Sequence, residues 1–151
     1  GIFIREQKDA ERIPELINTP AGGKFLSMYL IEPVYLDPSW LKDIDWVVVG
    51  GESGLNAKPC EESWIRSVVT QCKEAGVPVF VHRMGANFHR DGFRHWYKGK
   101  DGADPSEWPE ALRVREIPKG VIPSSLNNWL RLEVDNHDTK QSSLLHSFSV
   151  G

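Results

Sequence analysis

The sequence has only two cysteines, Cys60 and Cys72, and no apolar run long enough to cross a membrane. Two cysteines cannot build the disulfide framework of a small secreted domain. A membrane helix needs about 18 or more consecutive apolar residues, so none is predicted. The amino terminus also lacks the basic start, apolar core and small cleavage-site residues of a signal peptide. We therefore expect a cytoplasmic protein without a membrane partner.

An excess of charge of one sign is also missing. The 151 residues include 18 Lys and Arg against 21 Asp and Glu, a formal net charge of −3. A slightly acidic chain does not bind nucleic acid over its whole surface, although its net charge is compatible with a local basic patch. With 40% hydrophobic and 26% charged residues, the chain has the composition of a globular protein rather than a disordered one. Its length suits one domain with a real core.

Buried strands and helices alternate over the first 81 residues. Strands are predicted over residues 1–5, 25–31, 45–50 and 77–81, helices over 8–18 and 61–75, and a helical turn around 39–42. The run Trp46-Val47-Val48-Val49 has no polar alternation, which is typical of a strand covered on both faces. Pro14 predicts that the first helix kinks or restarts there. The alternation indicates an α/β fold with about four parallel strands, either an open sheet or half of a TIM-type barrel.

Beyond His82 this alternation stops. Residues 82–103 contain several glycines and many basic and aromatic side chains. Residues 104–109 are predicted to form one capped helical turn, and residues 112–115 an edge strand. The serine-rich residues 119–151 predict a poorly ordered tail, with one helical turn around 126–132. The sequence thus indicates a folded part, 1–118, and a tail of different origin.

A glycine-rich loop, Gly50-Gly51-Glu52-Ser53, follows the clearest strand directly. α/β proteins bind ligands beyond the carboxyl ends of their strands, and glycine lets the backbone approach a ligand closely. The Glu52 carboxylate can accept hydrogen bonds from an amino group or a ribose hydroxyl. The alternative is a tight turn with an exposed acid.

Two further strand ends carry polar residues. Glu32 lies near the end of the second strand, and His82 and Arg83 end the fourth. Alternation along a strand predicts that one of His82 and Arg83 points into the mouth of the sheet and the other outward. The guanidinium of Arg83 suits a phosphate or carboxylate of a substrate. The alternatives are a surface acid and a strand end with a satisfied histidine.

Residues 82–100 combine five basic side chains with one acid, Asp91. Basic groups for phosphates and flat rings for bases are the means by which proteins bind single-stranded nucleic acid. The candidate nucleic-acid contacts are Arg90, Arg94, Trp96, Tyr97 and Lys98. The alternative is a solvated loop with a few core aromatics. The three histidines of this segment do not match a zinc-ligand spacing, so no metal site is predicted.

Several segments together resemble one family. They are Ala10 to Leu16, Thr19-Pro20-Ala21, Phe25-Leu26-Ser27, Ile44 to Gly54, Gln71-Cys72, Ala75 to Pro78, Met84-Gly85-Ala86 and Asp104 to Pro109. This set is similar to the phage and prophage proteins called gp-thirty-seven/gp-sixty-eight-like, of the radical S-adenosylmethionine (SAM) class. The resemblance extends from the first residue to about residue 118. The sequence departs from the family pattern around Glu32-Pro33 and at His82-Arg83.

The resemblance implies a partial TIM-type barrel. In that class a cysteine-rich loop holds a [4Fe–4S] cluster that cleaves SAM reductively, and a Gly-Gly-Glu element binds the SAM amino group. A cluster needs several closely spaced thiolates, and this chain has two cysteines, one of them in a predicted helix. The resemblance therefore implies the carboxyl-terminal half of the barrel, with SAM a possible ligand of residues 50–53 and the cluster site absent.

Three functions follow as hypotheses. The chain is part of an enzyme that is inactive without its amino-terminal half, or a module that binds single-stranded nucleic acid, or a decayed, truncated product. The apolar strand at the very start indicates a chain entered in mid-fold. Half a barrel has open sheet edges, so we expect it to pair with the missing half or with itself.

Overall fold

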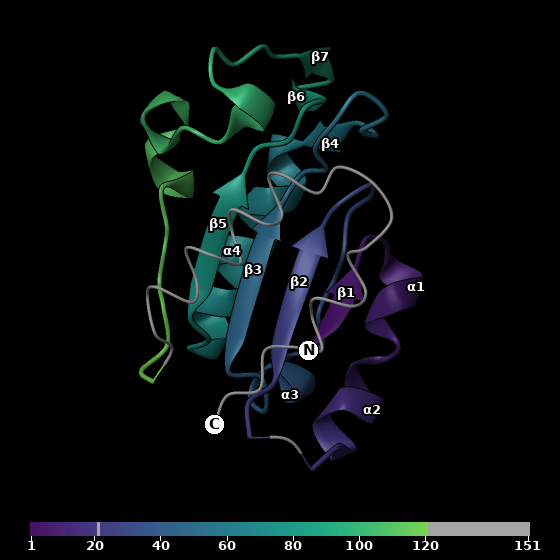
Figure 1. Cartoon of the computed structure of the whole chain (residues 1–151). Helices are drawn as coiled ribbons and strands as arrows, with labels where there is room; N and C mark the ends of the chain where they lie inside the picture. Colours follow the sequence, from purple (N-terminus) through teal and green to yellow (C-terminus); the bar gives the residue numbers. More distant parts are fainter. Residues whose placement is uncertain (21, 121–151) are drawn as a thin grey trace.

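A four-stranded parallel sheet forms the centre of the computed structural model, which describes residues 1–20 and 22–120 (Figure 1). Its strands are β1 (Ile2–Ile4), β2 (Phe25–Tyr29), β3 (Trp46–Gly50) and β5 (Val79–Arg83), in the order β1-β2-β3-β5. The predicted number and direction of these strands are confirmed. The described strands form an open sheet and no closed barrel. The predicted tail lies outside the described residues from 121 onward, including the helical turn at 126–132.

Four α-helices connect these strands. They are α1 (Gln7–Ala10), α2 (Ile13–Asn18), α3 (Pro38–Leu41) and α4 (Glu62–Ala75). Pro14 is the second residue of α2, where no backbone N–H is needed, so the predicted restart of the helix is confirmed. Gly76 ends α4 in the left-handed conformation that glycine adopts readily. In the described part of the chain, no helix is long and apolar enough to cross a membrane.

The helices pack against one face of the sheet. Every buried apolar residue of α1 to α4 belongs to one cluster with Leu26, Val47, Val49, Val79 and Val81. The opposite face has its own buried cluster, formed by Phe25, Trp46, Val48 and Phe80 with Phe3 against it. No described helix contributes to that second cluster. All the described helices therefore lie on one side of the sheet. In Figure 1, α4 lies behind β3 and β5.

A second, smaller sheet stands above the carboxyl ends of the strands (Figure 1). It consists of β4 (Cys60–Glu61), β6 (Phe88–Arg90) and β7 (Phe93–Arg94). β6 and β7 form an antiparallel hairpin around Asp91 and Gly92, whose φ angles are 52° and 80°. Positive φ at both turn residues is what a two-residue hairpin of type I′ requires. This hairpin was not predicted from the sequence.

The chain then returns along the outer edge of β5. After the 3₁₀ turns η1 (Lys100–Gly102), η2 (Pro105–Glu107) and η3 (Glu110–Leu112), it pairs antiparallel with β5. Val81 N donates to Val114 O at 2.8 Å, and Glu116 N donates to Val79 O at 3.0 Å. The helical turn predicted at 104–109 is confirmed, and the predicted edge strand is confirmed only for its last residues. One sheet edge is therefore covered in part, and association through the β1 edge stays a prediction.

Removing a core side chain beneath the sheet is expected to destabilise the fold. Ile65 on α4 is fully buried, so Ile65→Ala should lower the free energy of unfolding by about 2–5 kcal/mol. The control, Leu55→Ala, removes a fully exposed side chain and should change it by less than about 0.5 kcal/mol. Urea unfolding followed by tryptophan fluorescence measures both. Equal effects of the two substitutions would contradict this core.

Candidate ligand site at the strand ends

The carboxyl ends of all four parallel strands border one pocket of about 830 Å³. Phe3 and Arg5 come from the end of β1, Tyr29 from β2 and Arg83 from β5. The rest of the described lining comes from residues 52–57 after β3 and from residues between 86 and 101. Ligands of parallel α/β folds bind at this end of the sheet. The location therefore agrees with the one expected from the sequence.

Gly50 and Gly51 are required by the packing of the chain against itself. A Cβ atom at Gly50 would lie 2.5 Å from Arg83 O, and one at Gly51 would lie 2.4 Å from Met84 O. The two segments are joined by hydrogen bonds from Gly51 N to Arg83 O (3.2 Å) and from Ala86 N to Glu52 O (2.8 Å). Neither glycine is among the described lining residues. The glycines hold the loop in place, and the loop carries Glu52 and Ser53 into the pocket.

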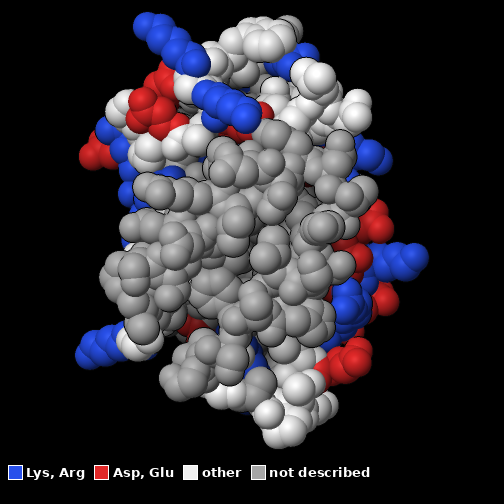
Figure 2. All heavy atoms as spheres, viewed as in Figure 1, with Lys and Arg blue, Asp and Glu red and all other residues white. Residues whose placement is uncertain are grey.

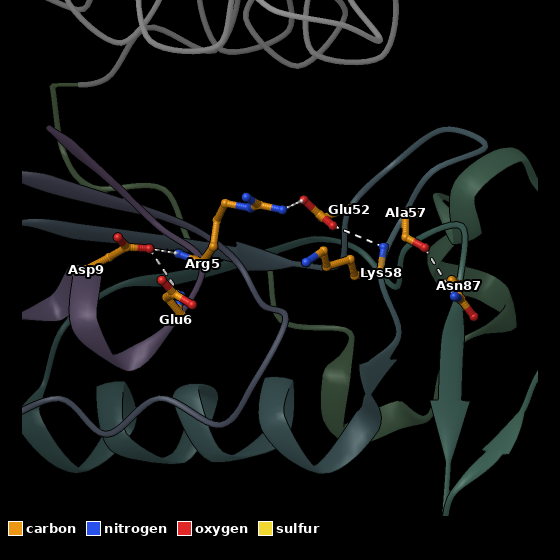
Figure 3. A network of polar contacts seen from close by, with 7 residues as sticks. All are labelled: Arg5, Glu6, Asp9, Glu52, Ala57, Lys58 and Asn87. Atoms are coloured by element: carbon orange, nitrogen blue, oxygen red, sulfur yellow. Dashed lines mark hydrogen bonds and ion pairs between the residues drawn. The ribbon is translucent and has the colours of Figure 1, made fainter.

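The carboxylate of Glu52 is fixed by two partners (Figure 3). Its Oε2 accepts a hydrogen bond from Arg5 Nη2 at 2.5 Å, and its Oε1 accepts one from Lys58 N at 3.1 Å. The backbone N of Arg5 in turn donates to Asp9 Oδ2 at 2.9 Å. Glu52 thus links the end of β1 to the loop after β3. A carboxylate has about four acceptor positions, so each oxygen can still accept from a ligand.

Arg83 is buried at 1% exposure and lines the pocket. Its Nε donates to Gly51 O at 3.1 Å, and its Cζ lies 4.8 Å from the centre of the Tyr29 ring. Nη1 and Nη2 are both buried and have no hydrogen-bond partner. A buried guanidinium normally pairs with a carboxylate or with several carbonyls, so the lack of a partner for Nη1 and Nη2 is unusual.

His82 lies beside Arg83 and is also buried. Its Nδ1 is 2.7 Å from the hydroxyl oxygen of Tyr29. Burial, and then the charges of Arg83 and Arg115, hold the pKa of His82 well below its usual value. Both His82 and Arg83 contact Tyr29, although strict alternation predicts opposite faces. The reason is a register shift between β3 and β5, where Gly50 pairs with Arg83 and Val49 with Val81.

Glu32 is placed elsewhere. Its Oε1 accepts a hydrogen bond from Gln7 N, the first residue of α1, at 2.7 Å. It is not among the described residues that line the pocket. The structure thus gives Glu32 a local role at the start of a helix.

The basic and aromatic residues of the 82–100 segment divide into two groups. Arg94 and Trp96 line the pocket, with the Arg94 Cζ 3.8 Å from the centre of the Trp96 ring. Trp96 is 71% exposed, so the pair forms part of the rim. In Figure 2, several Lys and Arg side chains lie at the upper end of the molecule, with Asp and Glu side chains beside them, and others lie along its sides.

The other candidates of that segment do not line the pocket in the described structure. Arg90 pairs with Glu62 on α4, which also binds Arg66 at 2.5 Å. Tyr97 packs against the rings of Phe88 and His95, and burial raises its pKa to about 12. Lys98 is exposed, and its backbone N donates to Glu107 Oε1 at 2.9 Å.

Sequence reasoning missed six polar residues of the pocket, which are Arg5, Tyr29, Asn56, Asn87, Lys100 and Asp101. Arg5 and Tyr29 end or directly follow strands, so the strand-end rule that selected Glu52 and Arg83 could have found them. Lys100 and Asp101 come from a 3₁₀ turn that no sequence pattern places at the pocket. With them, the described lining has four basic and two acidic side chains. The lining therefore suits an anionic group of a ligand, such as a carboxylate or a phosphate.

Comparison with known protein families gives a match over most of the chain. A family described as "Protein of unknown function (DUF5131)" matches residues 1–116 of the chain. No curated protein and no solved structure matches the chain. The matched residues include the whole parallel sheet and every described residue that lines the pocket.

The burial of His82 makes a prediction about pH. The folded protein keeps this imidazole neutral, whereas the unfolded chain protonates it near pH 6.5. The unfolded state therefore binds more protons as the pH falls below about 6.5, and stability is lost there, with a limiting slope of about 1.4 kcal/mol per pH unit. His82→Asn should remove this part of the loss between pH 7.5 and 5.5 in urea unfolding.

His95→Gln is the control for this experiment, because His95 is exposed. It should keep the pH dependence of the unmodified chain. An unchanged slope in the His82→Asn protein would show that His82 is not a buried neutral group.

Proposed function

The chain belongs to the DUF5131 family, whose function is unknown, and we propose that it forms half of a radical-SAM-like α/β barrel whose mouth binds SAM. One observation carries the proposal. All four parallel strands deliver residues to a single pocket at their carboxyl ends. This is where barrel proteins assemble their binding sites.

The strand order and the placement of the helices support half a barrel rather than a doubly wound sheet. The strand order follows the chain, and the described helices all pack on one face. A doubly wound sheet reverses its strand order at a switch point and places helices on both faces. A barrel keeps sequential order and places its helices outside. The cluster formed by Phe25, Trp46, Val48 and Phe80 then corresponds to the inside of a barrel.

The cysteines do not fit a [4Fe–4S] cluster. Such a cluster needs several thiolates near one another, and the chain has only Cys60 and Cys72. Both are buried, and burial raises the pKa of each thiol to about 12, which disfavours the thiolate form. Under this proposal a separate half of the barrel holds the cluster, and this chain supplies ligand-binding residues alone.

The pocket has groups that fit the amino-acid part of SAM. Its volume lies within the range of small-molecule sites, about 300–1,000 Å³. SAM presents an ammonium group, a carboxylate and a sulfonium centre, together with an adenosine. Its net charge is positive, so its carboxylate is the part that matches the basic side chains of the lining. Glu52 can accept from the ammonium group, and the unpartnered Nη groups of Arg83 can donate to the carboxylate. Ser53 lies beside Glu52 in the lining and can donate from its hydroxyl.

Titration of the full chain with SAM in a calorimeter tests this proposal. Glu52→Gln should weaken SAM binding by about tenfold or more, because a hydrogen bond to a charged group is lost. Glu32→Gln is the matched control: it removes another carboxylate that follows a strand but lies outside the described pocket lining. It should leave the affinity unchanged. Absence of SAM binding, or equal affinity in the Glu52→Gln protein, would contradict the proposal.

A second candidate function is binding of single-stranded nucleic acid. The observation in its favour is the exposed Arg94–Trp96 stack at the pocket rim, with Lys100 in the same lining. A stacked aromatic ring and basic groups suit a base and its phosphates. Arg90, another basic candidate of this segment, forms an ion pair with Glu62.

Fluorescence anisotropy with a labelled oligothymidine at low salt tests this second function. Replacing Arg94 and Trp96 together by alanine should lower the affinity by about tenfold or more and reduce the dependence on salt. Arg66→Ala, on α4, removes an exposed arginine that does not line the described pocket, and should have little effect. If the unmodified chain does not bind at low salt, this function is excluded.

A further inference from the structure

The most unusual group in the described structure is the guanidinium of Arg83. Its Nη1 and Nη2 are the only nitrogen atoms among the buried, unpartnered side-chain groups of the described residues. The side chain is 1% exposed, so solvent does not satisfy these donors. A charged group in this state costs folding free energy, and it is stable only where something compensates the charge.

The protein groups around Arg83 fix its position without using its outer edge. The Nε is held by Gly51 O at 3.1 Å, and the Tyr29 ring lies beneath the guanidinium at 4.8 Å. Together these contacts fix the plane of the group and leave the two Nη atoms as a fork. A rigid fork of two N–H groups matches the two oxygen atoms of a carboxylate or a phosphate.

No described acid of the pocket neutralises this fork. Glu52 binds Arg5 and the backbone of Lys58, and Asp101 Oδ1 accepts from Gly54 N at 3.3 Å. The partner of Arg83 must therefore come from outside the described residues. Arg83 and Tyr29 are the fully buried polar members of the lining, so they form its floor, while Trp96 and Leu55 are exposed at the rim.

We infer that Arg83 anchors an oxyanion subsite at the floor of the pocket, which binds the carboxylate or phosphate end of a ligand. The inference goes beyond the proposed function because it holds for any ligand that ends in such a group. The excess of basic over acidic side chains in the lining draws the same class of ligand into the pocket. The ligand enters past the rim and places its anionic end against the Nη fork.

Thermal unfolding of the full chain tests the subsite with simple anions. The midpoint is compared in sodium phosphate, sodium acetate and sodium chloride at equal pH and ionic strength. Phosphate or acetate should raise the midpoint above that in chloride, because an anion that binds only the folded state stabilises it. Arg83→Gln should abolish this rise, and Arg83→Lys should reduce it, since lysine keeps the charge but loses the fork.

Arg115→Gln is the matched control. Arg115 lies beside the same strand, but its guanidinium is already bonded to Val81 O and His82 O. This variant should keep the response to the anion, which separates a specific subsite from the general effect of salts on stability. A phosphate-only response identifies a phosphoryl ligand, an acetate-only response identifies a carboxylate ligand, and a response to both supports an unselective oxyanion subsite.

A second measurement covers the case in which Arg83→Gln does not fold. In ¹⁵N NMR of the unmodified chain, the side-chain N–H resonance of Arg83 should shift on addition of phosphate or acetate and stay unchanged in chloride. If neither anion moves this resonance, or if Arg83→Gln keeps the full thermal response, the inference is overturned.

If these anions bind but SAM does not, the subsite stands and the proposed function fails. If SAM binds equally well to the Arg83→Gln protein, the proposed function stands and the subsite fails.

Discussion

The close contact between the backbone of Gly50–Gly51 and that of residues 83–85 is the constraint on which the site depends. Side chains at either glycine would meet carbonyl oxygens of the neighbouring segment at 2.4–2.5 Å. Without them, the ends of β3 and β5 join through hydrogen bonds, and Gly51 O also holds the Nε of Arg83. Overpacking at such a position costs about 1–3 kcal/mol or more. The same contact therefore stabilises the sheet and positions two of its functional candidates.

From this contact the remaining geometry of the pocket follows. The loop after β3 carries Glu52 to the end of β1, where Arg5 binds it, and so closes one side of the pocket. The register shift beside Gly50 brings Arg83 over Tyr29, while the hairpin of β6 and β7 leads to the rim residues Arg94 and Trp96. Arg83 is held by a backbone carbonyl and a ring, and Glu52 by a backbone N–H and the Arg5 side chain, so both groups are preorganised.

The parallel sheet could be predicted from the sequence because its signals are local. The apolar run of β3, the stripe of α4 and Pro14 each determine structure within a few residues. The sequence identified some residues of the candidate site from their position at or directly after a strand end, such as Glu52 and Arg83. The hydrogen bond of Glu32 to the start of α1 depends on a long-range contact, and the contact of both His82 and Arg83 with Tyr29 depends on a register shift; periodicity reveals neither. The β6–β7 hairpin did have a local signal, the Asp91-Gly92 turn.

A crystal structure of the full chain, grown in phosphate and then soaked in SAM, tests directly whether the strand ends form a ligand site with Arg83 at its floor. We expect ligand oxygen atoms within hydrogen-bond distance of both Nη1 and Nη2 of Arg83. Adenosine density in the same pocket, with the ammonium group next to Glu52, would support SAM as the ligand. A structure in which protein groups satisfy both Nη atoms, and the pocket stays without ligand, would contradict it.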